Sequence, residues 1–126
     1  MKQNQKKFQK RFCRIKLFVR MMNENEAYLN SAVFYGLTNL NNGFDAPAIL
    51  YFSEADFEII LRRIEELKLG IYGIEPWLDG KYFDTAIQED FSDDPTNPDW
   101  YWKAFEQFKS LNLPLQYAAT YFIPEK

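Results

Sequence analysis

The fold of this chain is decided by the stretch Ile71–Phe91, IYGIEPWLDGKYFDTAIQEDF, which predicts a β-hairpin. Two runs of strand-forming residues, 71–78 and 81–91, flank the dipeptide Asp79-Gly80. This dipeptide suits a two-residue type I′ turn, because both turn residues need a positive φ. We therefore expect an antiparallel hairpin centred on this turn.

The turn also predicts a register for the two strands. The expected pairs are Trp77 with Tyr82, Glu75 with Asp84, and Ile74 with Thr85. Glu75, Asp84, Trp77 and Tyr82 would then share one face, and the other face would carry Ile74 and Ile87 toward a core. Like charges placed opposite each other on a sheet are destabilising. The expected Glu75 and Asp84 pair therefore suggests a site for a cationic ligand.

Helix signals lie on both sides of the hairpin. Ser53 with Asp56 three residues later predicts a helix, and its apolar stripe ends at Leu67, before a stop at Gly70. Asn97-Pro98-Asp99 predicts the start of another helix, with a cap residue, proline at the first position and an acid at the second. The expected core face of this helix is Tyr101, Phe105, Phe108 and Leu111, with Trp100 on the other side.

An earlier helix is predicted from Asn23 and Glu26, which match a capping box. Its expected apolar face is formed by Leu29, Val33, Leu37 and Leu40.

The remaining segments complete an α+β fold. Residues 48–52 are expected to form a short strand or an extended segment, and residues 115–123 a last strand. Pro76 cannot donate to a ladder, so we expect its strand at an edge. The prediction is a small, mainly antiparallel sheet, made of the hairpin, the last strand and at most one more strand, packed against about three helices.

Charge divides the chain into a basic leader, residues 1–22, and a single acidic domain, residues 23–126. The first twenty positions carry eight basic residues and no acid, whereas the rest carries seven basic and eighteen acidic residues. Two interpretations of the leader stay open. It forms a basic amphipathic helix, or translation begins at Met21 or Met22 and the leader is not part of the native protein.

Catalytic chemistry has little support in this composition. The chain has no histidine, which removes the commonest general base and most zinc sites, and it has no glycine-rich phosphate loop. With the single Cys13 there is no internal disulfide framework, as expected for a cytoplasmic protein. Two alternatives remain: paired carboxylates, Glu75 with Asp84, and a carboxylate metal site among Glu89, Asp90, Asp93, Asp94 and Asp99. We expect no catalytic residues, no cofactor and no metal.

Acidic residues concentrate between positions 75 and 99, where eight of them accompany Lys81 alone. Such a segment repels nucleic acid and attracts basic proteins. The simpler interpretation is a solvated face that keeps the protein soluble. Trp77, Tyr82, Trp100 and Trp102 lie within or beside this segment in the sequence. Aromatic residues ringed by charge are typical anchors of protein interfaces, although most aromatic residues of a small domain fill its core.

Three short motifs resemble the immunity proteins of bacterial contact-dependent growth inhibition systems that neutralise ribonuclease toxins. They are the hairpin with Gly73-Ile74-Glu75-Pro76-Trp77, then Asn97-Pro98-Asp99-Trp100-Tyr101 with Lys103-Ala104-Phe105, and last Tyr117-Ala118-Ala119-Thr120-Tyr121. The resemblance covers about residues 44–123. It implies a cytoplasmic, non-enzymatic antidote that binds the toxin domain of its cognate delivered protein and blocks its RNA-degrading site.

The expected function is thus an immunity protein that binds a basic nuclease toxin domain. Its predicted contacts are ten acidic and aromatic residues: Glu75, Trp77, Asp79, Tyr82, Asp84, Asp90, Asp93, Asp94, Asp99 and Trp100. We expect no nucleic acid on the acidic domain and no membrane partner; the oligomeric state stays open. The alternative is an adaptor whose basic leader binds nucleic acid or a membrane surface.

Overall fold

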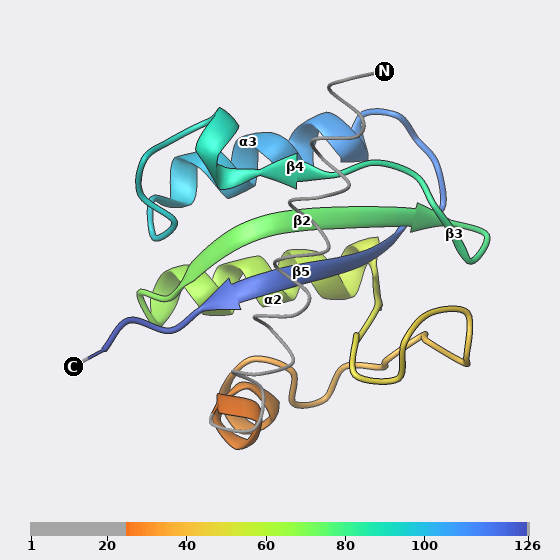
Figure 1. The fold of residues 1–126 in the computed structure, drawn as a ribbon, viewed down its shortest axis with the longest axis horizontal. Helices are drawn as coiled ribbons and strands as arrows, with labels where there is room; N and C mark the ends of the chain where they lie inside the picture. The colour runs from red at the N-terminus through yellow and green to blue at the C-terminus, as the bar shows by residue number, and fades with distance from the viewer. Residues whose placement is uncertain (1–24, 126) are drawn as a thin grey trace.

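The computed structural model describes residues 25–125, which form an α+β domain of three helices and a five-stranded antiparallel sheet (Figure 1). A helical segment, 25–32, comes first. The elements that follow are β1 (Phe52–Ser53), α2 (Glu54–Glu66), β2 (Gly70–Leu78), β3 (Lys81–Tyr82), β4 (Ala86–Ile87), the 3-10 helix η1 (Gln88–Asp90), α3 (Pro98–Lys109) and β5 (Gln116–Phe122). The predicted fold class is confirmed. The basic leader, with Cys13, and the cap residue Asn23 lie outside the described residues.

The sheet has the order β1-β5-β2-β3, and β4 also pairs with β2. The strand β2 is therefore central, with β5 along one side and the short β3 and β4 along the other. The expected edge position of Pro76 is wrong. The carbonyl of Pro76 faces β3 and accepts from the N–H groups of both Phe83 and Asp84, at 3.2 and 3.3 Å. Proline is tolerated there because the ladder is interrupted at this point.

The hairpin turn forms as predicted, but the strand register beyond the turn differs from the prediction. Asp79 and Gly80 have φ values of 53° and 73°, and Trp77 pairs with Tyr82. One extra residue then enters the second strand, because Phe83 and Asp84 both face Pro76, which is the arrangement of a β-bulge.

This bulge reverses the faces predicted for the second strand. Ile74 pairs with Ala86 instead of Thr85, so Asp84 is not the partner of Glu75. Ile87 pairs with Gly73 and lies on the face opposite to Ile74. The like-charge pair expected from the sequence is therefore absent from the sheet.

The helix α2 begins as predicted and ends differently. The Ser53 side chain accepts from the N–H of Asp56. At the other end, Lys68 adopts a left-handed conformation, with φ of 58°, and the N–H of Leu69 donates to the carbonyl of Ile64 at 3.0 Å. This is a Schellman motif. The predicted stop, Gly70, is instead the first residue of β2.

Two more predictions about helices need correction. The first helix ends at residue 32, so Leu37 and Leu40 lie in the irregular segment that follows it, while Leu29 and Val33 are buried as expected. In α3, Asn97 caps the helix as predicted, but the buried face includes Trp100 and Ala104. None of the helices in the described part is long and apolar enough to span a membrane.

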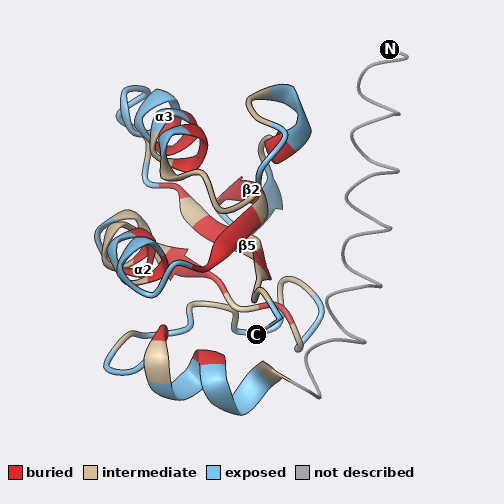
Figure 2. Cartoon of the chain, turned by 90° about the vertical axis from the view of Figure 1, so that its left-hand side faces the viewer, coloured by how far each residue is buried: buried red, intermediate tan, exposed pale blue. Residues whose placement is uncertain are grey.

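The core lies mainly on one face of the sheet, under α2 and α3 (Figure 2). It contains the stacked rings of Phe57 and Tyr117, 5.0 Å apart. A smaller cluster lies on the opposite face, where Trp77 and Ala118 meet Tyr51 and Ile49 from the segment before β1.

Candidate functional site

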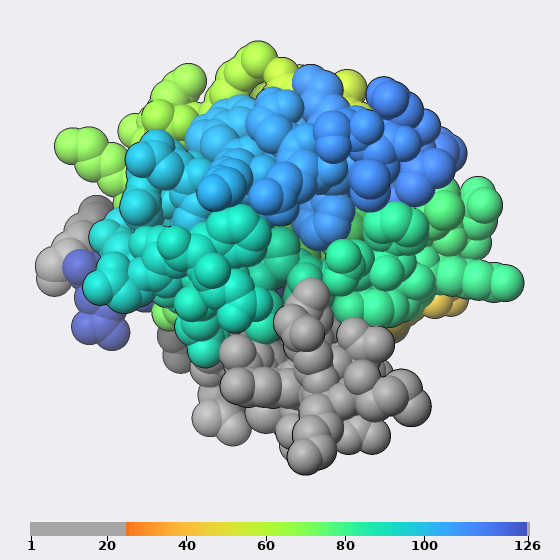
Figure 3. All heavy atoms as spheres, turned by 90° about the horizontal axis from the view of Figure 1, so that it is seen from above, coloured from red at the N-terminus to blue at the C-terminus, as the bar shows by residue number. Residues whose placement is uncertain are grey.

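Five of the predicted contact residues are exposed aspartates without an ion-pair partner in the range 25–125. They are Asp79, Asp90, Asp93, Asp94 and Asp99. Asp79 lies in the hairpin turn. The other four belong to the acidic loop, which we define as residues 88–99. Figure 3 shows this loop in teal beside α3, and the hairpin residues in green at the other side of the same view.

The acidic loop is held in place by backbone contacts and short side-chain bonds. The carbonyl of Pro95 accepts from the N–H of Ile71 at 3.0 Å, which ties the loop to the start of β2. Asp94 accepts from both the N–H and the hydroxyl of Thr96, at 2.9 and 2.7 Å. These two bonds lower the pKa of Asp94, so its charge persists under mildly acidic conditions.

The hairpin end of β2 is distant from the acidic loop. Ile71 contacts the loop, and Asp79 follows the last residue of β2. An extended strand rises about 3.3 Å per residue, so these two points are separated by roughly 25 Å. The ten predicted contact residues therefore do not form one continuous site.

Glu75 and Trp77 lie on one face of β2, as predicted, and both are buried at 8% exposure. The indole N–H of Trp77 donates to the Glu75 carboxylate at 2.8 Å. Asp84 is half-buried and accepts from the N–H of the next residue, Thr85, at 2.7 Å. Because the strand register does not place Asp84 opposite Glu75, the paired-carboxylate alternative loses the opposed geometry on which it depended.

Trp77 is the centre of an aromatic cluster. Its ring lies 5.2 Å from Tyr51, 5.6 Å from Phe44 and 6.5 Å from Tyr82, measured between centroids. Of these rings, Tyr82 is the exposed one, at 47%, and its hydroxyl lies 2.8 Å from that of Thr85. A partner could therefore reach Tyr82 directly, whereas Trp77 lies behind it.

Trp100 belongs to the core and is only 2% exposed. Its ring packs against Phe91 of the acidic loop, with 5.5 Å between centroids. The expected role of Trp100 as a surface anchor is wrong for this conformation. It supports the loop from beneath instead.

The segment that positions the aromatic cluster was not identified as part of a site from the sequence. Asn41 organises it, since its amide donates to the carbonyls of Ala46 and Ile49 at 3.0 and 2.8 Å. Asn39 accepts from the N–H of Tyr51 at 3.0 Å. The Asn41-Asn42-Gly43 sequence indicates a break in secondary structure, but no periodicity predicts which strand the segment will cover.

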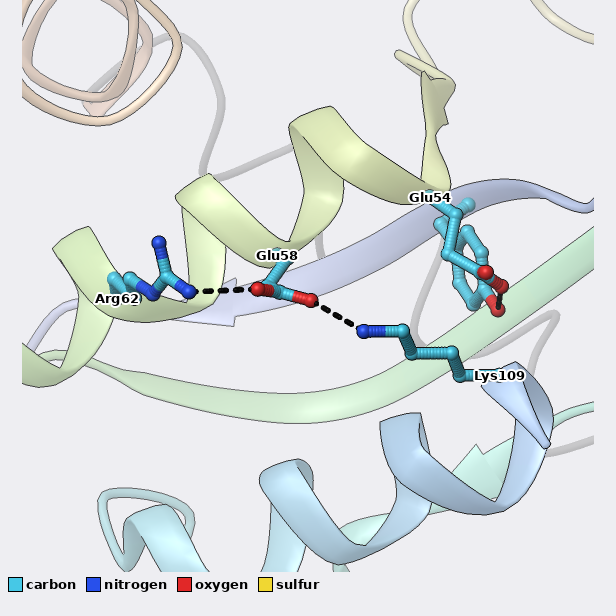
Figure 4. A network of polar contacts seen from close by, with 5 residues as sticks. Glu54, Glu58, Arg62 and Lys109 are labelled. Atoms are coloured by element: carbon cyan, nitrogen blue, oxygen red, sulfur yellow. Dashed lines mark hydrogen bonds and ion pairs between the residues drawn. The ribbon is translucent and has the colours of Figure 1, made fainter.

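Other acids are engaged in structural contacts (Figure 4). Glu58 on α2 accepts from Arg62 at 2.7 Å and from Lys109 of α3 at 2.9 Å, and the Lys109 bond is the main cause of its lowered pKa. Glu54 accepts from the hydroxyl of Tyr117 at 2.6 Å. Glu58 therefore links the two helices, in contrast to the aspartates of the acidic loop.

The structure does not support a metal site within residues 25–125. Among residues 25–125, no group of three or more Asp, Glu, His or Cys side chains is arranged to hold an ion. The carboxylates weighed as a metal site, Glu89 to Asp99, therefore do not converge.

In comparisons with known proteins, no family model, curated protein or solved structure matches this chain.

Proposed function

We propose that this domain is an immunity protein, an inhibitor that binds a basic ribonuclease toxin domain. The observation that carries the proposal is the set of exposed aspartates of the acidic loop, Asp90, Asp93, Asp94 and Asp99, which have no ion-pair partner among residues 25–125. Exposed carboxylates without ion-pair partners leave a negative field around the loop, which would attract a cationic partner.

The chemistry of a nuclease supports this choice of partner. An enzyme that binds a polyanion presents lysine and arginine around its active site. An acidic surface that matches this patch accelerates association and competes with the substrate for the same cations. In this proposal the acidic loop supplies the charge, and Tyr82 with Asp79 at the hairpin supplies a separate contact.

The test uses the product of the gene immediately upstream of this chain, which the proposal expects to carry the nuclease toxin domain, co-expressed and purified with it. We expect a 1:1 complex that blocks RNA cleavage and weakens as salt rises. Replacing Asp93, Asp94 and Asp99 with asparagine should slow association at low ionic strength about tenfold or more and flatten its salt dependence. Stopped-flow association measured at two salt concentrations reports both effects.

A matched control changes the net charge by the same three units elsewhere, near the C-terminal end of α3, with Glu106→Gln, Gln107→Lys and Leu111→Lys at exposed positions. This control variant should keep most of the association rate. Equal slowing in both triple variants would assign the effect to net charge alone. A complex whose salt dependence is the same with and without the three aspartates would refute the role of the acidic loop, and the absence of any complex would refute the proposed function.

A further inference from the structure

A groove of about 370 Å³ lies beside the acidic loop, at the end of the domain where α2 stops and the chain ends. Its walls are mainly apolar and come from three places: Tyr28 of the first helix, Leu67 and Leu69 after α2, and Ile123 and Pro124 after β5. The volume lies at the lower end of the range of ligand pockets in proteins, about 300–1,000 Å³. It can accept one or two apolar side chains of a partner.

The groove exists because of how α2 ends. The left-handed conformation of Lys68 directs its two leucine neighbours differently, so that Leu69 is buried at 4% exposure and Leu67 stays 41% exposed. Tyr28, on the other wall, is 42% exposed. Two of the five exposed large hydrophobic residues in the described range therefore line the same groove. Large apolar residues gathered in one exposed place are typical of interaction sites.

The groove and the acidic loop adjoin each other. Gly70 follows Leu69 directly and lies against Pro95 of the loop, and the N–H of Ile71 donates to the Pro95 carbonyl. Figure 1 places the end of α2, the acidic loop and the C-terminus at the same side of the domain. Lys68 and Glu125 at the groove have opposite charges, and the nearby negative charge comes from the exposed Glu66, next to Leu67, and from Asp93 and Asp94, just before Pro95.

We infer that this groove receives an apolar side chain that is flanked by lysine or arginine in a segment of the nuclease toxin domain. The inference rests on the proposed function and adds a specific anchor to it. Charge complementarity decides the occupant, because an apolar pocket with exposed carboxylates nearby that have no ion-pair partner among residues 25–125 fits a segment that is both apolar and basic. Strong interfaces combine a desolvated apolar centre with a charged rim in this manner.

Photocrosslinking tests the location of this contact. Tyr28 is replaced by the photoreactive amino acid p-benzoylphenylalanine, and the same replacement is made at Leu111, which is 48% exposed and lies at the far end of α3. The Tyr28 variant should crosslink to the co-purified toxin domain through a peptide that contains an apolar residue next to lysine or arginine. The Leu111 variant should not crosslink to that peptide.

Affinity provides the second measurement. Leu67→Ser should raise the Kd of the complex about tenfold or more, and Leu111→Ser should change it less than about twofold. If the wild-type chain binds the toxin and both variants bind equally well, the groove is not the anchor although the proposed function stands. A Tyr28 crosslink to a second copy of this chain, or to no protein while the complex is present, would overturn the inference as well. Failure of the wild-type chain to bind would refute the proposed function itself.

Discussion

Replacing Gly70 by alanine tests the contact that fixes the acidic loop to the sheet. Gly70 does not have a positive φ, so its backbone permits alanine. A β-carbon there would lie 2.8 Å from the carbonyl oxygen of Pro95, 2.9 Å from its carbon and 3.0 Å from the Phe122 ring. The Phe122 side chain is partly exposed and can move. The Pro95 carbonyl is fixed by the N–H of Ile71, so backbone must shift.

The sign of the effect depends on two opposing contributions. In the absence of a clash, Gly→Ala raises the free energy of unfolding by about 0.4–1 kcal/mol, because the unfolded chain loses freedom. Overpacking against fixed atoms lowers it by about 1–3 kcal/mol, and weakening the Ile71 to Pro95 hydrogen bond lowers it by roughly 1 kcal/mol more. We expect Gly70→Ala to destabilise the domain by about 1–3 kcal/mol.

Thermal and urea unfolding followed by circular dichroism measure this change. For a chain of this size, about 1 kcal/mol corresponds to roughly 4 °C in Tm, so the expected decrease is about 4–12 °C. The control is Gly36→Ala, where no atom lies within 4 Å and the cost arises only from the positive φ of 78°. Hydrogen exchange of the Ile71 amide distinguishes the two variants, because the exchange rate should increase only in Gly70→Ala. A Gly70→Ala protein with unchanged or higher Tm and a protected Ile71 amide would refute the reasoning.

Two further predictions concern buried and bridging groups. Tyr121→Phe should raise the free energy of unfolding by about 1 kcal/mol, because its hydroxyl is buried without a hydrogen-bond partner among residues 25–125; a loss of stability in urea titrations would contradict this. Burial also raises the pKa of Tyr121, so the folded state keeps a proton that the unfolded state releases above about pH 10. The stability of the wild type should therefore fall with rising pH more steeply than that of Tyr121→Phe. Glu58→Gln should lower Tm at pH 7, and the difference in Tm from the wild type should shrink in 1 M salt. The difference should also shrink below pH 4, because the pKa of Glu58 is lowered in the folded state and its stabilising charge is lost as pH falls. Equal Tm values at pH 7 in low salt would contradict a role of Glu58 in linking the helices.

Local signals in the sequence were sufficient to predict the hairpin turn and the starts of α2 and α3. Asp79-Gly80, Ser53 and Asn97 act through their own backbone geometry and through bonds within three residues, and all three form as expected. The same locality explains the errors. The bulge at Phe83 and Asp84 depends on how Pro76 meets the opposite strand, and period-two alternation contains no sign of an inserted residue.

Trp100 shows a different kind of error, because the sequence did contain a usable signal. Trp100, Ala104 and Phe108 are spaced four residues apart, and all three are buried with Tyr101 and Phe105. A face chosen from Tyr101, Phe105, Phe108 and Leu111 alone was too narrow, and Leu111 is in fact 48% exposed. The helix buries a wider face because it packs against the sheet and also against Phe91 of the acidic loop.

The support beneath the acidic loop bears on how the proposed inhibitor would bind. Asn97 caps α3 at the end of the loop, Pro95 ties the loop to β2, and Phe91 packs the loop on Trp100. A fixed loop loses little conformational freedom when a partner binds, so more of the charge attraction remains as affinity. If the loop binds the toxin as proposed, this support contributes to the affinity, whereas a solvated face that only keeps a protein soluble gains nothing from it.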